Sequence, residues 1–127
     1  MAKSILVIDD DELILKTLKR LLTKEGYKIT VALNGAKAFS EITQRNFDLI
    51  ISDIKMPEMD GVEALKKIRA HLILNNRKLI PEIIITGYAK EKIYQDALAL
   101  KAAAYIEKPF DMQPLLEAIS NLIGICR

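Results

Sequence analysis

Four separated points of the sequence carry acidic, hydroxyl or basic side chains, each at the end of a short apolar run. An acidic run at positions 9–11 follows the first apolar run, and Asp53 follows a later one. Thr86 and Lys108 stand at the ends of two further runs. Clustered carboxylates repel one another in a partly buried site, so they favour a bound cation. Oxygen ligands of this kind suit Mg²⁺, which typically accepts one or two carboxylates and keeps several waters.

One carboxylate of such a cluster can point at an open position and attack phosphorus, which forms an acyl phosphate. The new phosphoryl oxygens then need neutralising by the metal, a lysine and a hydroxyl donor. The side chains that supply these parts are Asp9, Asp10, Asp53, Lys108 and Thr86. If the carboxylates repel one another without metal, replacing Asp10 by Asn should stabilise the metal-free protein.

The elements that must position these side chains alternate between two kinds. Short runs rich in β-branched residues predict strands that are buried on both faces: Ser4–Ile8, Lys28–Ala32, Leu49–Ser52, Glu82–Thr86 and Ala104–Ile106. Apolar residues at helical spacing predict helices between and after them, with stripes at 14–22, 35–45, 62–72, 93–100 and 115–123.

This order is (βα)₅, an α/β fold in which right-handed crossovers produce a doubly wound parallel sheet covered by helices on both faces. Ligands of such folds gather outside the carboxyl ends of the strands. The chemical residues stand at those ends, so we expect them to meet at one edge. The 127 residues suit a single domain spanning positions 1–127.

The sequence resembles the receiver domain of bacterial response regulators, the family of the chemotaxis switch protein. The resemblance spans the whole chain, in order and spacing, and is carried by four motifs: Val7-Ile8-Asp9-Asp10, the run Asp53-Ile54-Lys55-Met56-Pro57-Glu58-Met59-Asp60-Gly61, Ile85-Thr86-Gly87, and Tyr105-Ile106-Glu107-Lys108-Pro109-Phe110. It implies a flavodoxin-like sheet with strand order 2-1-3-4-5.

By this resemblance Asp53 is the phosphoacceptor. Asp10 and Asp53 would bind Mg²⁺ together with the backbone carbonyl of Lys55. Asp9 would complete the acidic pocket, with a contact to the metal through water. The resemblance also implies that the domain catalyses only its own phosphorylation and dephosphorylation and is not an enzyme acting on other substrates.

The switch residues are likewise implied by the resemblance. Lys108 would pair with the phosphoryl group, and Thr86 would move to hydrogen-bond it. Tyr105 would change rotamer with Thr86, although Tyr105 as a plain core residue is the alternative. Phosphorylation would then switch partner binding on the face formed by the fourth helix, fifth strand and fifth helix.

The partners implied are a sensor histidine kinase or a histidine phosphotransfer protein, together with an unidentified effector protein or domain. A phosphorylation-dependent dimer is compatible with this reading. On the first helix, four cations either form a solvated face or meet the phosphodonor: Lys16, Lys19, Arg20 and Lys24.

Lys55 and Tyr88 predict a long phosphoryl lifetime. Each lies two residues after a site residue, so both should flank the approach of water to the phosphoryl group. Crowding that approach would slow hydrolysis. The pair resembles that of the sporulation phosphorelay receiver more than that of the chemotaxis protein. The alternative is that both are ordinary solvent-facing residues.

Three positions depart from the receiver pattern. Lys101 stands where glycine is usual, at the end of the fourth helix, and we expect it to adopt the left-handed backbone conformation. The segment 69–81 is a few residues longer than in the chemotaxis protein. Gly87 stands where alanine is common. Within the acidic run, Asp11 is expected to cap the following helix.

Two other function classes fit parts of the pattern. A phosphatase of the haloacid dehalogenase type would use an Asp-x-Asp pattern after the first strand, which Asp9 and Asp11 allow, but no cap domain is present. A flavodoxin would need a phosphate loop rich in Ser, Thr and Gly after the first strand, where this chain has acids.

Composition narrows the setting further. The net charge of +2 is too small and dispersed to predict direct nucleic-acid or membrane binding. One cysteine cannot form an internal disulfide, and no apolar run reaches the length of a membrane span. With no visible targeting segment, a cytoplasmic location is expected.

Overall fold

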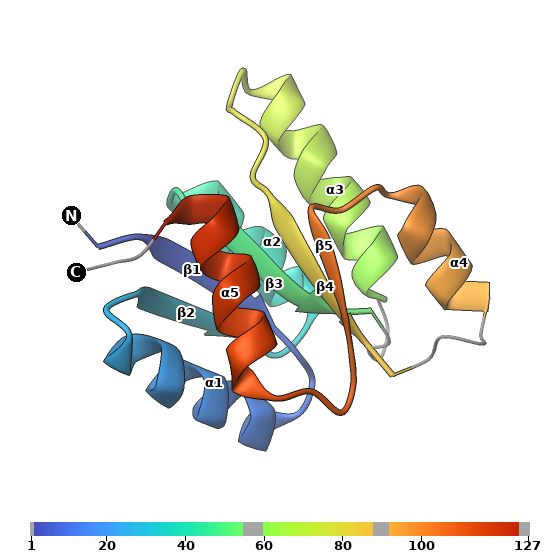
Figure 1. The fold of residues 1–127 in the computed structure, drawn as a ribbon. Helices are drawn as coiled ribbons and strands as arrows, with labels where there is room; N and C mark the ends of the chain where they lie inside the picture. Colours follow the sequence, from blue (N-terminus) through green and yellow to red (C-terminus); the bar gives the residue numbers. More distant parts are fainter. Residues whose placement is uncertain (1, 55–59, 88–91, 125–127) are drawn as a thin grey trace.

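The computed structural model describes residues 2–54, 60–87 and 92–124. Strands and helices alternate from one end to the other (Figure 1). The strands are β1 (Ser4–Ile8), β2 (Lys28–Ala32), β3 (Leu49–Asp53), β4 (Glu82–Thr86) and β5 (Ala104–Glu107). The helices are α1 (Glu12–Lys24), α2 (Gly35–Gln44), α3 (Gly61–Leu74), α4 (Lys92–Ala99) and α5 (Met112–Ile123).

The five strands form one parallel sheet in the order β2-β1-β3-β4-β5, which confirms the predicted topology. Two strands run one residue further than the sequence pattern predicts. Asp53 continues β3 because it pairs with Ile85 of β4, and Glu107 continues β5 because it pairs with Thr86. Neighbouring strands, rather than apolar character, set these two ends.

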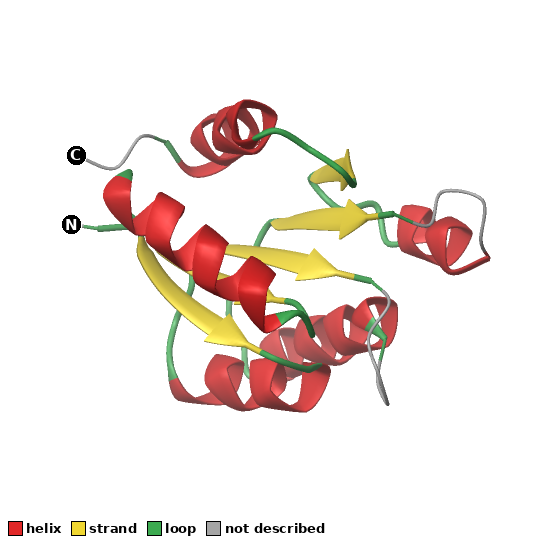
Figure 2. Cartoon of the chain, turned by 90° about the horizontal axis from the view of Figure 1, so that it is seen from below, coloured by secondary structure: helices red, strands yellow, loops and turns green. Residues whose placement is uncertain are grey.

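Helices cover both faces of the sheet, as seen along its edge in Figure 2. On one face, α1 and α5 pack against the sheet through buried residues such as Leu22 and Ile119. On the other face, α2, α3 and α4 pack through residues such as Ile42, Leu65 and Ala97. The strands between these layers are therefore buried on both sides, which explains their nearly continuous apolar sequences.

Short polar side chains cap the N-termini of three helices. Asp11, Asn34 and Asp60 stand directly before α1, α2 and α3, and each accepts a hydrogen bond from a backbone N–H of the first turn. Such capping satisfies donors that have no partner within the helix. The expected capping role of Asp11 is thus confirmed: its carboxylate accepts from the Leu13 N–H at 2.9 Å.

The segment 69–81 forms the last turns of α3 and a loop leading to β4. Arg77 in this loop donates to the Ile42 carbonyl at 2.6 Å and to the Arg45 carbonyl at 3.1 Å. These bonds satisfy carbonyls at the end of α2 and fix the loop against it. Among the described residues, no helix has the length and apolar character needed to cross a membrane.

Candidate functional site

The carboxyl ends of the strands bring the chemical residues together at one edge of the sheet. Asp9 directly follows β1, whereas Asp53 and Thr86 are the last residues of β3 and β4. Lys108 directly follows β5, and its N–H donates to the Thr86 carbonyl at 2.7 Å. All strands point the same way (Figure 2), so residues nearly one hundred positions apart in sequence become neighbours.

Three carboxylates form the centre of this edge. One oxygen each from Asp9, Asp10 and Asp53 lies within 4.8 Å of the others. Asp9 and Asp53 are buried, while Asp10 is exposed. A donor set made only of hard oxygens, with one member open to solvent, fits Mg²⁺, because this ion keeps part of its water shell.

Hydrogen bonds fix the two buried carboxylates. Asp53 Oδ1 accepts from the Ile54 N–H at 2.8 Å, and Asp9 Oδ1 accepts from the Asp11 N–H at 3.0 Å. The second oxygen of each carboxylate faces Lys108, whose Nζ lies 3.4 Å from both. Both acids therefore have one oxygen held by the backbone and one directed toward the shared site.

The electrostatics of the site are unfavourable to the two buried charges. Burial raises the pKa of the Asp9 carboxyl, and the nearby Asp53 charge adds to this effect. Burial likewise raises the pKa of Asp53, against the lowering effect of Lys108. For Lys108, burial alone would lower the pKa, but the attraction of Asp53 and Asp9 outweighs it and raises the pKa. One lysine does not neutralise the cluster, so a further cation would be stabilised there.

Gly61 is a positioning element that the sequence reasoning quoted within a motif without assigning it a role. A Cβ at this position would lie 2.2 Å from the Asp53 carbonyl oxygen and 2.7 Å from Ile54 Cα. The Gly61 N–H instead donates to the Ile54 carbonyl at 2.7 Å. Its place as the first residue of a helix, directly after the capping Asp60, is the sequence signal that could have revealed this close approach.

The two residues of the expected switch, Thr86 and Tyr105, lie on the neighbouring strands β4 and β5. Thr86 is 1% exposed at the end of β4, next to the site. Tyr105 is half-buried on β5, and its hydroxyl donates to the Ala97 carbonyl at 2.9 Å. Tyr105 packs partly against the core on the α3 side of the sheet. Tyr105 therefore belongs partly to the core, and the rotamer change that the resemblance implies for it stays a prediction.

Two expected site residues, Lys55 and Tyr88, lie outside the described residues. The assignments that involve them, the metal-binding carbonyl of Lys55 and the lifetime effect of the pair, stay predictions.

Lys101 adopts φ of +54°, which confirms the left-handed conformation expected at the end of α4.

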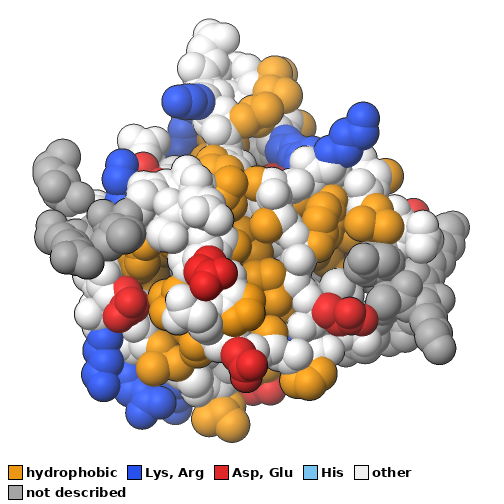
Figure 3. Space-filling model, viewed as in Figure 1, with side chains coloured by type: hydrophobic (Ala, Val, Ile, Leu, Met, Phe, Trp, Pro, Cys, Tyr) orange, Lys and Arg blue, Asp and Glu red, His pale blue; other side chains and the backbone are white. Residues whose placement is uncertain are grey.

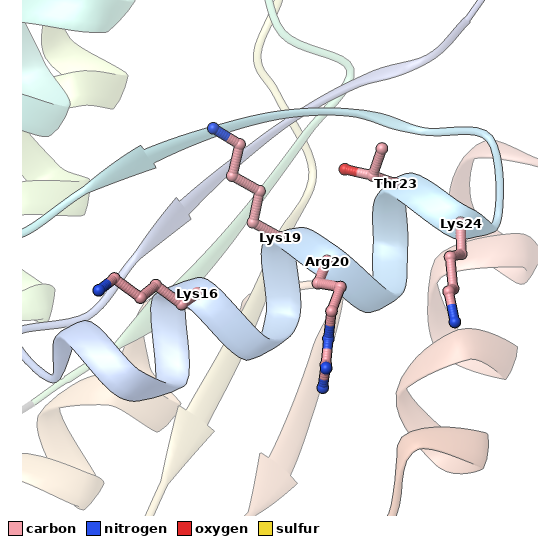
Figure 4. Close-up of a pocket in the computed structure, with 5 residues that line it drawn as sticks. All are labelled: Lys16, Lys19, Arg20, Thr23 and Lys24. Carbon is pink, nitrogen blue, oxygen red and sulfur yellow. The ribbon is translucent and has the colours of Figure 1, made fainter.

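The cationic side chains of α1 line one surface hollow of about 500 Å³ (Figure 4). They extend from the helix into solvent, and within the described part of the chain none of them forms an ion pair. This hollow is lined by Lys16, Lys19, Arg20, Thr23 and Lys24. Both expectations for this face, a solvated surface and a partner contact, remain open.

Comparisons with known proteins identify the family to which the chain is similar. The chain matches the response regulator receiver domain family over residues 5–120. It is 33% identical to sporulation initiation phosphotransferase F of Bacillus subtilis, covering 98% of this chain and 97% of that protein. It is 36% identical to the transcriptional regulatory protein ZraR of Klebsiella oxytoca, covering 97% of this chain but 27% of that protein.

A solved structure shares the fold. The response regulator protein TrrA from Thermotoga maritima, determined in complex with Mg²⁺ and BeF, superposes with a TM-score of 0.80 at 34% identity. The alignment covers 95% of this chain and 99% of TrrA. The chain spans between 26% and 57% of the length of several curated transcriptional regulators that it matches. The acidic cluster, the facing lysine and these matches together establish that the chain belongs to the response regulator receiver domain family.

Proposed function

We propose that this receiver domain, residues 1–127, takes a phosphoryl group on Asp53 in a Mg²⁺-dependent reaction. The observation that carries the proposal is the geometry of Asp53: it is 4% exposed, one oxygen accepts from the Ile54 N–H, and the other faces Lys108. A buried, oriented carboxylate beside a cation is suited to attack phosphorus.

In the proposed reaction, a carboxylate oxygen of Asp53 forms the new O–P bond. The P–N bond of a phosphohistidine donor, or the P–O bond of a small acyl phosphate, breaks, and its electron pair leaves with the donor. Lys108 moves from the carboxylates to the phosphoryl oxygens, where its charge is stabilising. Thr86, at the adjacent strand end, supplies the hydroxyl that then hydrogen-bonds the phosphoryl group.

The metal would be held by Asp10, Asp53 and the backbone carbonyl of Lys55, with Asp9 contacting it through water. When bound, Mg²⁺ supplies positive charge that lowers the cost of bringing a phosphoryl group to an acidic pocket. The support for these ligands is the carboxylate cluster itself, whose oxygens lie within 4.8 Å of one another.

Acetyl phosphate with Mg²⁺ tests the proposal directly. Intact-mass spectrometry should detect one added phosphoryl group on the wild type and none on Asp53→Asn. Asp11→Asn is the matched control: it removes a neighbouring acid that caps α1, and it should still be labelled. Equal labelling of wild type and Asp53→Asn would remove Asp53 as the acceptor.

The partners we propose are a sensor histidine kinase or a histidine phosphotransfer protein as donor, and an effector of unknown identity. The effector would bind the face formed by α4, β5 and α5, where apolar side chains reach the surface (Figure 3). Ile106 and Leu116 are partly exposed there, and Leu98 is 38% exposed. The relative ZraR is named a transcriptional regulatory protein. For the chain described here, we still predict that it does not bind nucleic acid directly.

We further propose that the phosphorylated state decays slowly. The proposal rests on sequence position alone: Lys55 and Tyr88 each follow a site residue by two positions. The double variant Lys55→Asn, Tyr88→Glu should lose its phosphoryl label about tenfold faster after removal of the donor, which corresponds to roughly 1.4 kcal/mol of barrier. Unchanged decay would refute the proposal.

A further inference from the structure

The C-terminal end of α4 is held by two side chains that come from other elements. The Ala97 carbonyl accepts from the Tyr105 hydroxyl at 2.9 Å, and the Leu98 carbonyl lies 3.4 Å from the same hydroxyl. The Leu100 carbonyl accepts from Arg69 Nη1 at 2.8 Å. The Ala97 and Leu98 carbonyls also accept from the Leu100 and Lys101 N–H groups, each at 3.1 Å, so the side-chain bonds add to a tight backbone turn at the end of α4.

Arg69 is itself fixed by a buried acid. Its Nε donates to Glu82 Oε2 at 3.0 Å, and its Nη2 pairs with Glu82 Oε1. Glu82 is 3% exposed and begins β4. The guanidinium is planar and presents its donors in a rigid fork, so one side chain can bridge Glu82 and Leu100 at once. A lysine at this position would offer a single ammonium group and could not reproduce the bridge.

The turn between α4 and β5 is therefore held from two sides. The Ala103 N–H donates to the Glu82 carbonyl at 2.9 Å, and the Ala102 N–H donates to the Tyr105 hydroxyl at 2.9 Å. Apolar packing also holds this region: Ala97 and Leu100 are buried in the core on the α3 side of the sheet. Polar contacts at the C-terminal end add to this packing and hold α4 next to α3 and β5 (Figure 1).

We propose that Arg69, braced by Glu82, is a positioning residue that holds the α4–β5 turn and, through it, the Tyr105 hydroxyl in the arrangement seen here. This inference rests on the proposed function of Asp53. In the same arrangement, Lys108 contacts both Asp9 and Asp53, the carboxylates that it leaves in the proposed reaction. An interaction that favours this arrangement opposes the phosphorylated one, so losing Arg69 should favour phosphorylation.

The first measurement needs no phosphoryl chemistry. In protein labelled with 3-fluorotyrosine, the Tyr105 resonance is assigned by its absence in Tyr105→Phe. We expect this resonance to shift or broaden in Arg69→Met, because the partners of the hydroxyl are no longer held. Arg77→Met is the matched control, since Arg77 also donates to carbonyls at a helix end, but at α2. A Tyr105 resonance that is the same in wild type and Arg69→Met overturns the inference.

The second measurement titrates beryllofluoride with Mg²⁺. Arg69→Met should bind it about threefold more tightly or better, while Arg77→Met should bind as wild type does. Arg69→Lys keeps a positive charge beside Glu82. It should also bind beryllofluoride more tightly than wild type, because a lysine cannot bridge Glu82 and Leu100. Equal or weaker binding by both Arg69 variants overturns the inference. Failure of the wild type to bind beryllofluoride would instead contradict the proposed function.

Discussion

At the scale of single residues, the site is a compromise between chemistry and stability. Asp9 and Asp53 are ionisable groups of low exposure, and each has a raised pKa because burial disfavours its charge. A carboxylate kept in such surroundings costs the folded state free energy at neutral pH. Functional sites commonly carry this kind of cost, and substitutions that remove it are stabilising.

Asp9→Asn should stabilise the metal-free protein at neutral pH by about 1 kcal/mol. Because the folded pKa of Asp9 is raised, the folded state binds more protons than the unfolded state between the unfolded and folded pKa values. Wild-type stability therefore falls as pH rises through that window, and Asp9→Asn should flatten the fall. Urea unfolding at several pH values measures both effects.

Sequence reasoning favoured Asp10→Asn for this experiment, but Asp10 is exposed, so its charge is largely solvated. We expect a smaller gain for Asp10→Asn than for Asp9→Asn, which makes the Asp10 variant the natural comparison. A metal-free Asp9→Asn protein that is less stable than wild type at neutral pH would show that the lost contact with Lys108 outweighs relief of the buried charge.

Two glycines near the site should respond differently to alanine. Gly61→Ala forces a Cβ against the backbone of Asp53 and Ile54, so we expect a loss of about 1–3 kcal/mol and slower phosphorylation. Gly87→Ala places its Cβ 3.6 Å from Lys108 Cβ, an ordinary contact, and should change stability by less than about 0.5 kcal/mol. Chemical unfolding of the two variants provides the test, and similar losses would contradict it.

At the scale of elements, helix ends depend on residues that accept unusual backbone angles. Lys101 at the end of α4 has φ of +54°, and Gly26 after α1 has φ of +96°. Side chains bearing a Cβ are strained in this region, whereas glycine is not. The chain thus uses a strained residue at one helix end and an unstrained one at another.

Lys101→Gly should be neutral or slightly stabilising. Removal of the left-handed strain, about 1 kcal/mol, is offset in part by the greater entropy that glycine gives the unfolded chain. Gly26→Ala introduces the same strain and should destabilise by about 1 kcal/mol. Thermal or urea unfolding checks both signs, and a clear loss of stability in Lys101→Gly would contradict the argument.

At the scale of the whole molecule, metal binding should increase the free energy of unfolding. A ligand that binds only the folded state adds about 2.7 kcal/mol at one hundred times its Kd. Saturating Mg²⁺ should therefore raise the urea midpoint of the wild type, and Asp10→Asn should lose most of this gain. NaCl at equal ionic strength is the control, because simple screening would stabilise wild type without a specific site.

Much of this molecule could be predicted from its sequence because its signals are local. Continuous apolar strands and amphipathic helices give the (βα)₅ order, and a parallel sheet then places Asp9, Asp53 and Lys108 at one edge. What could not be predicted depends on contacts between distant residues. The bridge from Arg69 to Glu82 and Leu100 joins α3, β4 and the turn after α4, and no sequence spacing or composition signals it.

The two outer strands of the sheet also affect how copies of the protein behave toward one another. Among the residues that the structure describes, β2 and β5 each have a neighbouring strand on one side only. Such edges can pair with another chain and start aggregation, and short or charged edges resist this. β5 has four residues and ends at exposed Glu107, while β2 has five and begins at exposed Lys28. Replacing Glu107 or Lys28 by valine should lower the highest protein concentration at which no aggregates form.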